Sequence, residues 1–249
     1  MSAVIGARPG SGHAAGRLDR LQHTWDLLVL LTRRELKLRY QDTVLGFAWS
    51  VVKPLLLGLV LYFALGEVLK IRIESYEHYH LFLLAALFPW TWFQTSVLLA
   101  APTFANNANL LKKVRFPRFV LPWATVANNM VHFLLSLPIL AGLMLLAGKT
   151  PGAAWLVGVP LLALLQLILV LGVALAVSSL DVFFRDLEHL VEVFLGLLFY
   201  ATPILYSLDL VPERFRPLVL LNPLGPLMEA WRELLLLNRL PGLDLWPAA

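Results

Sequence analysis

Long uninterrupted runs of apolar residues dominate the pattern along this chain. Four of them carry almost no charge, and they cover residues 44–68, 81–101, 119–147 and 153–178; a shorter run covers 190–206. A helix needs about 20 residues to cross a hydrocarbon layer of roughly 30 Å. None of the runs alternates with a period of two, as strands would. The pattern therefore predicts an all-α integral membrane protein with five visible membrane-spanning helices in a domain over residues 42–206.

The segment before the first run has a different pattern. Residues 1–17 are rich in Gly, Ala and Ser, and we expect a disordered arm there. In residues 18–41, Leu21, Trp25, Leu28 and Thr32 recur at helical spacing, while the cations occupy other faces. This predicts an amphipathic helix in the cytoplasmic headgroup plane. An ordinary solvated helix end is the alternative.

The segment over residues 207–249 is apolar but repeatedly interrupted. Asn222-Pro223 and Gly225-Pro226 divide it into two short pieces, because proline removes a backbone donor and disfavours helix in the residue before it. We expect two short re-entrant helices on the outer side. Broken backbone at membrane depth is tolerated only inside protein or beside water, so this hairpin should border a hydrated path.

The amino-acid composition agrees with a membrane protein and excludes some kinds of metal site and catalysis. The chain is 59% hydrophobic and only 14% charged, and it contains no cysteine, which excludes thiolate metal sites and thiol nucleophiles. The formal charge of +4 comes without a nucleic-acid recognition motif, so we expect membrane lipids and no nucleic acid as partners. The loop over residues 112–118 holds four basic residues and no acid, which predicts a cytoplasmic N-terminus.

Signatures of catalysis are missing from the sequence. It contains no GxxxxGK[ST] phosphate loop, no HExxH and no GxSxG. The histidines are scattered, and we expect no metal site. The chain is therefore predicted not to be an enzyme and to bind no cofactor, and any ATP must be hydrolysed by a partner.

Four stretches, in order, resemble the polysaccharide-export class of type-2 ABC permeases, which includes O-antigen, teichoic-acid and capsule exporters. They are RYQDTVLGFAW leading to Pro54, LKKVRFPR at 111–118, the loop 181–187, and LNPL at 221–224. The resemblance covers nearly the whole chain beyond residue 20. It implies a permease dimer in the bacterial inner membrane that moves a polysaccharide on an undecaprenyl-type lipid carrier.

The resemblance also implies two separate ABC ATPase subunits, which bind the ATP and magnesium. Family members have a sixth span after the re-entrant helices, whereas this sequence ends at Ala249. We expect the sequence to be truncated before that span; a C-terminus on the outer side is the alternative. The cytoplasmic surfaces predicted to contact the ATPases are Leu111, Lys112, Lys113, Arg115, Phe116, Arg118, Arg185 and Asp186. Simple topology-setting charge on anionic lipid is the alternative for these basic residues. The residues expected at the outer gate are Asn222, Pro223 and Pro226.

Aromatic residues are the candidates for contact with substrate. The cluster Phe88 to Phe93 lies about ten residues into the second run, too deep for a headgroup belt. Flat aromatic faces suit the apolar faces of sugar rings, and helix packing is the alternative. The residues predicted on the path are Phe47, Trp49, Lys53, Tyr62, Phe88, Trp90, Trp92, Phe93, Phe199 and Tyr200. Lys53 is expected to face the protein interior, near the headgroup phosphates of a lipid-linked substrate.

Polar residues at depth are a second set of candidates. Asn128, Asn129 and His132 share part of one face of the third run, and Gln94, Gln166 and Glu192 lie in other runs. Such residues hydrogen-bond between helices or face a water-filled path. The function predicted overall is polysaccharide export. The alternatives are an ABC permease for drugs or small lipids, and a non-ABC secondary carrier, which would be expected to show internal repeats.

Overall fold

The computed structural model describes residues 26, 28–32, 48–71, 73, 76–113, 116–184, 186–240 and 242. This part of the chain is mostly helical, and its only strand-like pairing is an isolated bridge between Ile73 and Tyr76. Four helices are long and apolar enough to cross a membrane: Trp49–Val68, Tyr79–Ala100, Val120–Leu146 and Ala154–Asp181. The predicted all-α membrane class is thereby confirmed.

The four long helices match the four long apolar runs. The first is α2 (Trp49–Leu61), which continues without a break as the π-helix η2 (Tyr62–Val68); the others are α3 (Tyr79–Ala100), α6 (Val120–Leu146) and α7 (Ala154–Asp181). The predicted start of the first run, at residues 44–47, lies outside the described residues.

The fifth apolar run forms a shorter helix, α8 (Leu187–Ala201), of 15 residues. At 1.5 Å per residue it spans about 22 Å, less than a typical hydrocarbon layer. The helix ends where it does because Thr202 precedes Pro203 and takes an extended conformation. Five crossings therefore stay a prediction.

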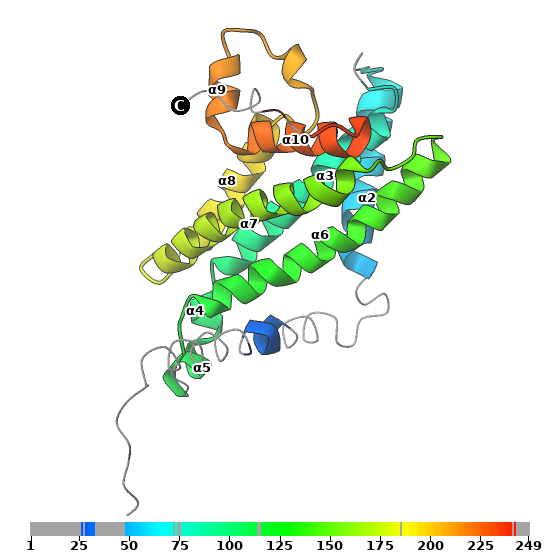
Figure 1. Ribbon diagram of the computed structural model, residues 1–249. Coiled ribbons are helices and arrows are strands. Elements are labelled where there is room, and N and C mark those ends of the chain that lie inside the picture. The colour runs from blue at the N-terminus through cyan, green and yellow to red at the C-terminus, as the bar shows by residue number, and fades with distance from the viewer. Residues whose placement is uncertain are drawn as a thin grey trace, which may run out of the picture.

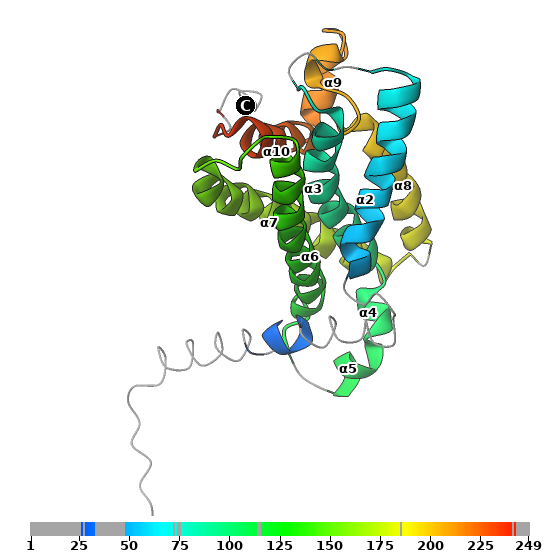
Figure 2. The ribbon, with the colours of Figure 1, turned by 90° about the vertical axis from the view of Figure 1, so that its right-hand side faces the viewer.

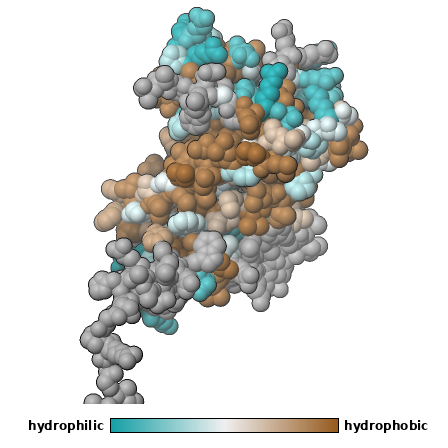
Figure 3. Space-filling model, in the orientation of Figure 1, coloured by the Kyte–Doolittle hydropathy of each residue, from teal (hydrophilic) through white to brown (hydrophobic). Residues whose placement is uncertain are grey.

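Helix α3 is the core of the molecule (Figures 1 and 2), and it packs against α2, α6, α7, α8 and α10. Residues 81–90 are all buried, because this helix is apolar on every side and finds neighbours on every side. By contrast, α7 turns leucines such as Leu156 and Leu164 outward. Figure 3 shows hydrophobic residues over the middle of the face it presents.

Short helices lie at the two ends of the bundle. At one end, α4 (Thr103–Asn106) and α5 (Ala108–Lys113) project from it (Figure 2). At the opposite end lie the 3₁₀ turn η3 (Leu208–Leu210), α9 (Arg216–Leu221) and α10 (Leu224–Leu237). In Figure 1, α10 lies across the bundle, and it packs on α3 and α7.

Asn238, the residue that follows α10, ties the end of this helix to the start of α7. Asn238 has a left-handed backbone, with φ of 53°, at the end of α10. Its side-chain oxygen accepts a hydrogen bond of 3.1 Å from the backbone N–H of Ala154, in the first turn of α7. A Cβ atom at Gly152 would come within 1.8 Å of the Asn238 side chain. Glycine is therefore needed at position 152 for this close approach.

The predicted domain boundaries remain predictions. The arm over residues 1–17 lies outside the described residues. Within the predicted interface helix over residues 18–41, Asp26 and residues 28–32 are described, and they are helical.

Candidate functional site

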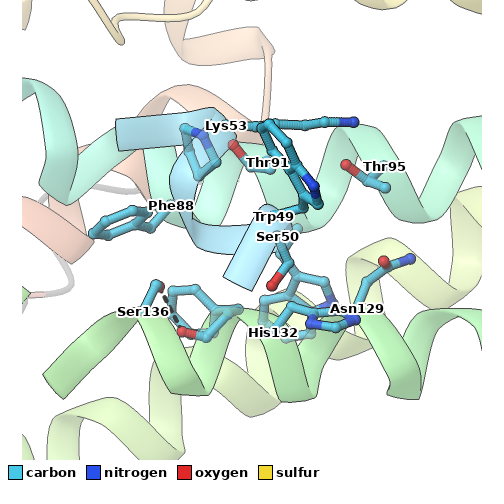
Figure 4. Close-up of a pocket in the computed structure, with 12 residues that line it drawn as sticks. Trp49, Ser50, Lys53, Phe88, Thr91, Thr95, Asn129, His132 and Ser136 are labelled. Atoms are coloured by element: carbon cyan, nitrogen blue, oxygen red, sulfur yellow. Dashed lines mark hydrogen bonds between the residues drawn. The ribbon is translucent and has the colours of Figure 1, made fainter. Parts of the chain in front are cut away.

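Helices α2, α3 and α6 line an open cavity of about 460 Å³ (Figure 4). The lining residues are Trp49, Ser50, Lys53, Pro54, Phe88, Thr91, Trp92, Thr95, Asn129, His132, Phe133 and Ser136. On each helix they recur after three and four positions, as Phe88, Thr91, Trp92 and Thr95 do on α3, which is the pattern of one helix face. Each helix therefore offers one continuous stripe, and the three stripes face a common space.

Aromatic rings make one part of the cavity wall rigid. The indole of Trp92 stacks on Phe133 with ring centroids 5.2 Å apart and an interplanar angle of 16°. Its Nε1–H donates a hydrogen bond of 3.3 Å to the backbone oxygen of Val126. Because stacking and the hydrogen bond both fix the indole, it presents a preorganised surface.

The remaining wall is polar. Thr91 and Thr95 come from α3, whereas Asn129, His132 and Ser136 come from α6. Among the described residues that line the cavity, Lys53 is the one with a formal charge at neutral pH, and none is acidic. The cavity therefore combines flat apolar faces with hydrogen-bonding groups and one cation.

The aromatic residues predicted for the path separate into two groups. Phe88, Trp92 and Trp49 line the cavity, together with Lys53. Trp90 points elsewhere: its ring lies 5.6 Å from those of Phe93 and Phe199.

The second group lies between α3 and α8. Trp90 donates from Nε1 to the side-chain oxygen of Gln94 at 3.0 Å. Phe199 packs edge-on against Tyr200, which is 68% exposed. Tyr62 lies apart from both groups, beside Glu67 and the ring of His80. Phe47 lies outside the described residues.

A buried charge lies at the end of the bundle covered by α10. Arg232 is fully buried and makes a salt bridge of 3.0 Å with Glu229, one turn earlier on α10. Its guanidinium donates to the backbone oxygens of Ile204 at 2.7 Å and Tyr206 at 3.4 Å. It also donates to the backbone oxygen of Phe82 at 3.4 Å. The central carbon of the guanidinium lies 3.6 Å from the centre of the Phe82 ring. One side chain thus joins α10, α3 and the segment after α8.

Tyr76 completes this network from the segment before α3. Its hydroxyl donates to Glu229 at 3.2 Å. Burial, and then the nearby Glu229 carboxylate, raise the pKa of Tyr76 above its usual range. The phenol therefore stays protonated and continues to donate to the carboxylate.

The buried side-chain amide of Gln166 links α7 to α10 and α3. Gln166 of α7 accepts a hydrogen bond of 2.6 Å from the indole N–H of Trp231. Its own N–H donates to the backbone oxygen of Pro89 at 2.7 Å. Sequence reasoning selected Gln166 but missed Trp231, Glu229 and Arg232. The i, i+3 pair of opposite charges in an apolar segment was the available signal.

The predicted outer-gate residues form the joint between α9 and α10. Asn222 donates from Nδ2 to the hydroxyl of Thr202 at 2.9 Å and accepts at Oδ1 from the backbone N–H of Leu224. Pro226 is buried, whereas Pro223 is exposed. A Cβ atom at Gly225 would lie 2.8 Å from the backbone oxygen of Val219, so the two helices meet closely only with glycine there.

Of the predicted ATPase-coupling residues, Leu111, Lys112 and Lys113 belong to α5, which lies at the opposite end of the bundle from α10 (Figure 2). Lys112 and Lys113 are exposed in the last turn of α5. Arg118 and Asp186 are also exposed, and Leu111 and Phe116 are partly buried. Arg115 and Arg185 lie outside the described residues.

Comparison with known proteins identifies the family. The family model described as "ABC-2 type transporter" matches residues 26–236. The chain belongs to the ABC-2 type transporter family. This ABC-2 protein is thus a membrane transport subunit that crosses the membrane several times, and not a catalytic subunit.

Two relatives have more specific names. The ABC-2 chain is 40% identical over 214 residues to the O-antigen export system permease protein RfbA of Klebsiella pneumoniae, covering 86% of this chain and 82% of the relative. It is 38% identical over 218 residues to the protein of the same name from Myxococcus xanthus, with the same coverage of 86% and 82%.

Proposed function

We propose that this chain is the permease of an ATP-driven exporter that moves a lipid-linked polysaccharide of the O-antigen type out across the bacterial inner membrane. The observation that carries the proposal is the identity of 40% and 38% to two proteins named as O-antigen export permeases. The sequence has no phosphate-binding loop of its own. Separate ATPase subunits with bound ATP and magnesium must therefore supply the energy.

The topology that we propose places the N-terminus, α4 and α5 in the cytoplasm and α10 on the outer side. The exposed cations Lys112, Lys113 and Arg118 support this orientation, because basic residues concentrate in cytoplasmic loops. On this topology α8 is a fifth, short crossing, and α9 and α10 form the re-entrant outer pair. A short helix can cross where the bilayer thins locally around it.

The assembly that we propose is a pair of permease chains above two ATPase subunits. Exposed apolar faces on α2, η2 and α8, including Leu59, Phe63, Phe194 and Leu197, support a second copy or lipid as their neighbour. At the proposed cytoplasmic end, the exposed lysines of α5 provide a cationic surface for the ATPase, and the partly buried Phe116 adds an apolar side chain to it.

The cavity among α2, α3 and α6 is our candidate for part of the glycan path. Trp49, which is 40% exposed, provides a flat surface for the apolar faces of sugar rings, and the buried rings of Trp92 and Phe88 support the wall beside it. The polar wall provides hydrogen bonds for sugar hydroxyls. Because each contact of this kind is modest, a long polymer can slide past them.

Deletion of the gene tests the proposed function. We expect loss of the surface polysaccharide, and restoration by the wild-type gene supplied on a plasmid. An otherwise identical strain that lacks an unrelated ABC permease serves as the control. Normal surface glycan in the deletion strain would overturn the proposal.

A further inference from the structure

The cavity contains one cation that no described residue pairs with. The side chain of Lys53 is exposed and makes no ion pair among the described residues, and no carboxylate is among the described residues that line the cavity. A charge within a membrane-spanning segment is costly unless an opposite charge or water accompanies it. A bound anion would supply that opposite charge.

The geometry points to a phosphate site: we propose that Lys53 binds the phosphate of a membrane lipid in this cavity, and specifically the diphosphate of the prenyl-type carrier that holds the glycan. The assignment to the carrier rests on the proposed function. A neutral sugar alone would leave the ammonium charge uncompensated.

The position of Lys53 fits a lipid phosphate. Its side chain lies along the α3 wall, and the ammonium group ends on the same side of the cavity as Thr95 and Asn129 (Figure 4). Thr95 is near the last turn of α3, and Asn129 is in the first half of α6. At 1.5 Å per residue, Thr95 lies about 8 Å and Asn129 about 14 Å from the ends of their helices next to α4 and α5. The cation therefore faces the proposed cytoplasmic leaflet.

The hydrogen-bonding groups separate into donors and acceptors. Thr91 donates its hydroxyl hydrogen to the backbone oxygen of Leu87, and Ser136 donates to that of Phe133. Those two hydroxyls can only accept from a ligand. Lys53 offers up to three N–H donors, and Thr95 lies at the same end. Phosphate oxygens are acceptors, so they match the Lys53 end of the cavity rather than the Ser136 end.

The size and the aromatic rings fit what is attached to the phosphate. A volume of about 460 Å³ lies within the range of small-molecule sites and accommodates a diphosphate together with one sugar. Trp49 is one turn before Lys53 on α2, and Trp92 is one turn before Thr95 on α3, so that both line the cavity that would hold that first sugar. The site would therefore recognise the junction of lipid and glycan, which every substrate molecule shares.

Binding to the purified protein in nanodiscs tests this site. Undecaprenyl diphosphate is titrated, and the bound lipid is counted by native mass spectrometry. Undecaprenol, which lacks phosphate, tests whether the phosphate is needed. Phosphatidylglycerol tests whether any phospholipid suffices. We expect Lys53→Gln to weaken binding of the diphosphate by about tenfold or more, as for loss of one charge-assisted contact. Lys53→Arg should retain most of it. Lys70→Gln, which removes an exposed lysine beyond η2, is the matched control and should bind normally.

Several results would overturn the site. One is equal binding of undecaprenyl diphosphate by wild type and Lys53→Gln, with both proteins folded by size-exclusion chromatography. Another is binding of undecaprenol as tight as that of the diphosphate. If phosphatidylglycerol bound at Lys53 and the carrier did not, the assignment to the carrier would be wrong. These outcomes leave the deletion phenotype untouched, so failure of the site and failure of the proposed function can be told apart.

Discussion

The buried guanidinium of Arg232 gives the sharpest prediction for stability. Arg232→Met keeps a long apolar side chain but leaves the carboxylate of Glu229 and three backbone oxygens without this donor. Removing one partner of a buried ion pair costs about 3–5 kcal/mol, because the other charge stays buried and unpaired. We expect a loss of stability of about this size, and separation of α10 from the first turn of α3.

The origin of that loss can be isolated with a double-mutant cycle. Most of the cost should come from the unpaired Glu229 carboxylate, so adding Glu229→Gln to Arg232→Met should recover about 1–2 kcal/mol. Arg232→Lys should be intermediate, since an ammonium group cannot reproduce the planar set of donors.

The assay is unfolding of the purified protein in one fixed detergent, followed by intrinsic fluorescence. Membrane proteins often unfold irreversibly, so unfolding rates and midpoints are compared at a single heating rate. Arg216→Met, at an exposed arginine of α9, is the matched control. The reasoning is refuted if Arg232→Met is as stable as the Arg216→Met control, or if the double variant is less stable than Arg232→Met alone.

Three further predictions concern coupling, the cavity and the outer joint. Replacing Lys112 and Lys113 with Glu should lower surface glycan while the ATPase still hydrolyses ATP, measured as phosphate release by the purified complex; unchanged ATPase stimulation together with unchanged export would contradict a coupling role. Trp92→Ala should reduce surface glycan on immunoblots while Trp92→Phe, which keeps the ring stack, should not; normal export with Trp92→Ala and only a lower unfolding midpoint would assign the indole to packing alone. Gly225→Ala should lower the unfolding midpoint, because a methyl group 2.8 Å from a backbone oxygen forces α9 away from α10; a midpoint equal to that of Gly142→Ala, where a Cβ meets nothing within 4 Å, would show that the joint is not tight.

Much of the helical framework could be predicted from the sequence, because long apolar runs have few other structures available in a membrane. The ends of the helices were harder to predict than their existence. The run over residues 190–206 was predicted to continue to its last aromatic residue, but α8 ends at Ala201. The restriction that Pro203 places on Thr202 was visible in the sequence and would have given the correct end.

The candidate site was less predictable. Trp90 and Trp92 were treated as one cluster, yet two positions on a helix differ by about 200° in direction, so both rings cannot face one cavity. Which of the two faces the cavity depends on how α2 and α6 pack on α3, and no local pattern contains that information. The burial of Arg232 likewise depends on backbone oxygens of Phe82, Ile204 and Tyr206, which come from distant parts of the chain.

The most direct test of the proposed function is the side of the membrane on which the lipid-linked glycan accumulates. Cells lacking this chain are converted into inside-out and right-side-out vesicles, and undecaprenyl-linked glycan is labelled with an impermeant reagent. We predict that the glycan of the deletion strain is labelled only in inside-out vesicles, and that the wild-type gene restores labelling in right-side-out vesicles. Glycan that reached the outer face without this chain would contradict the assignment as an export permease.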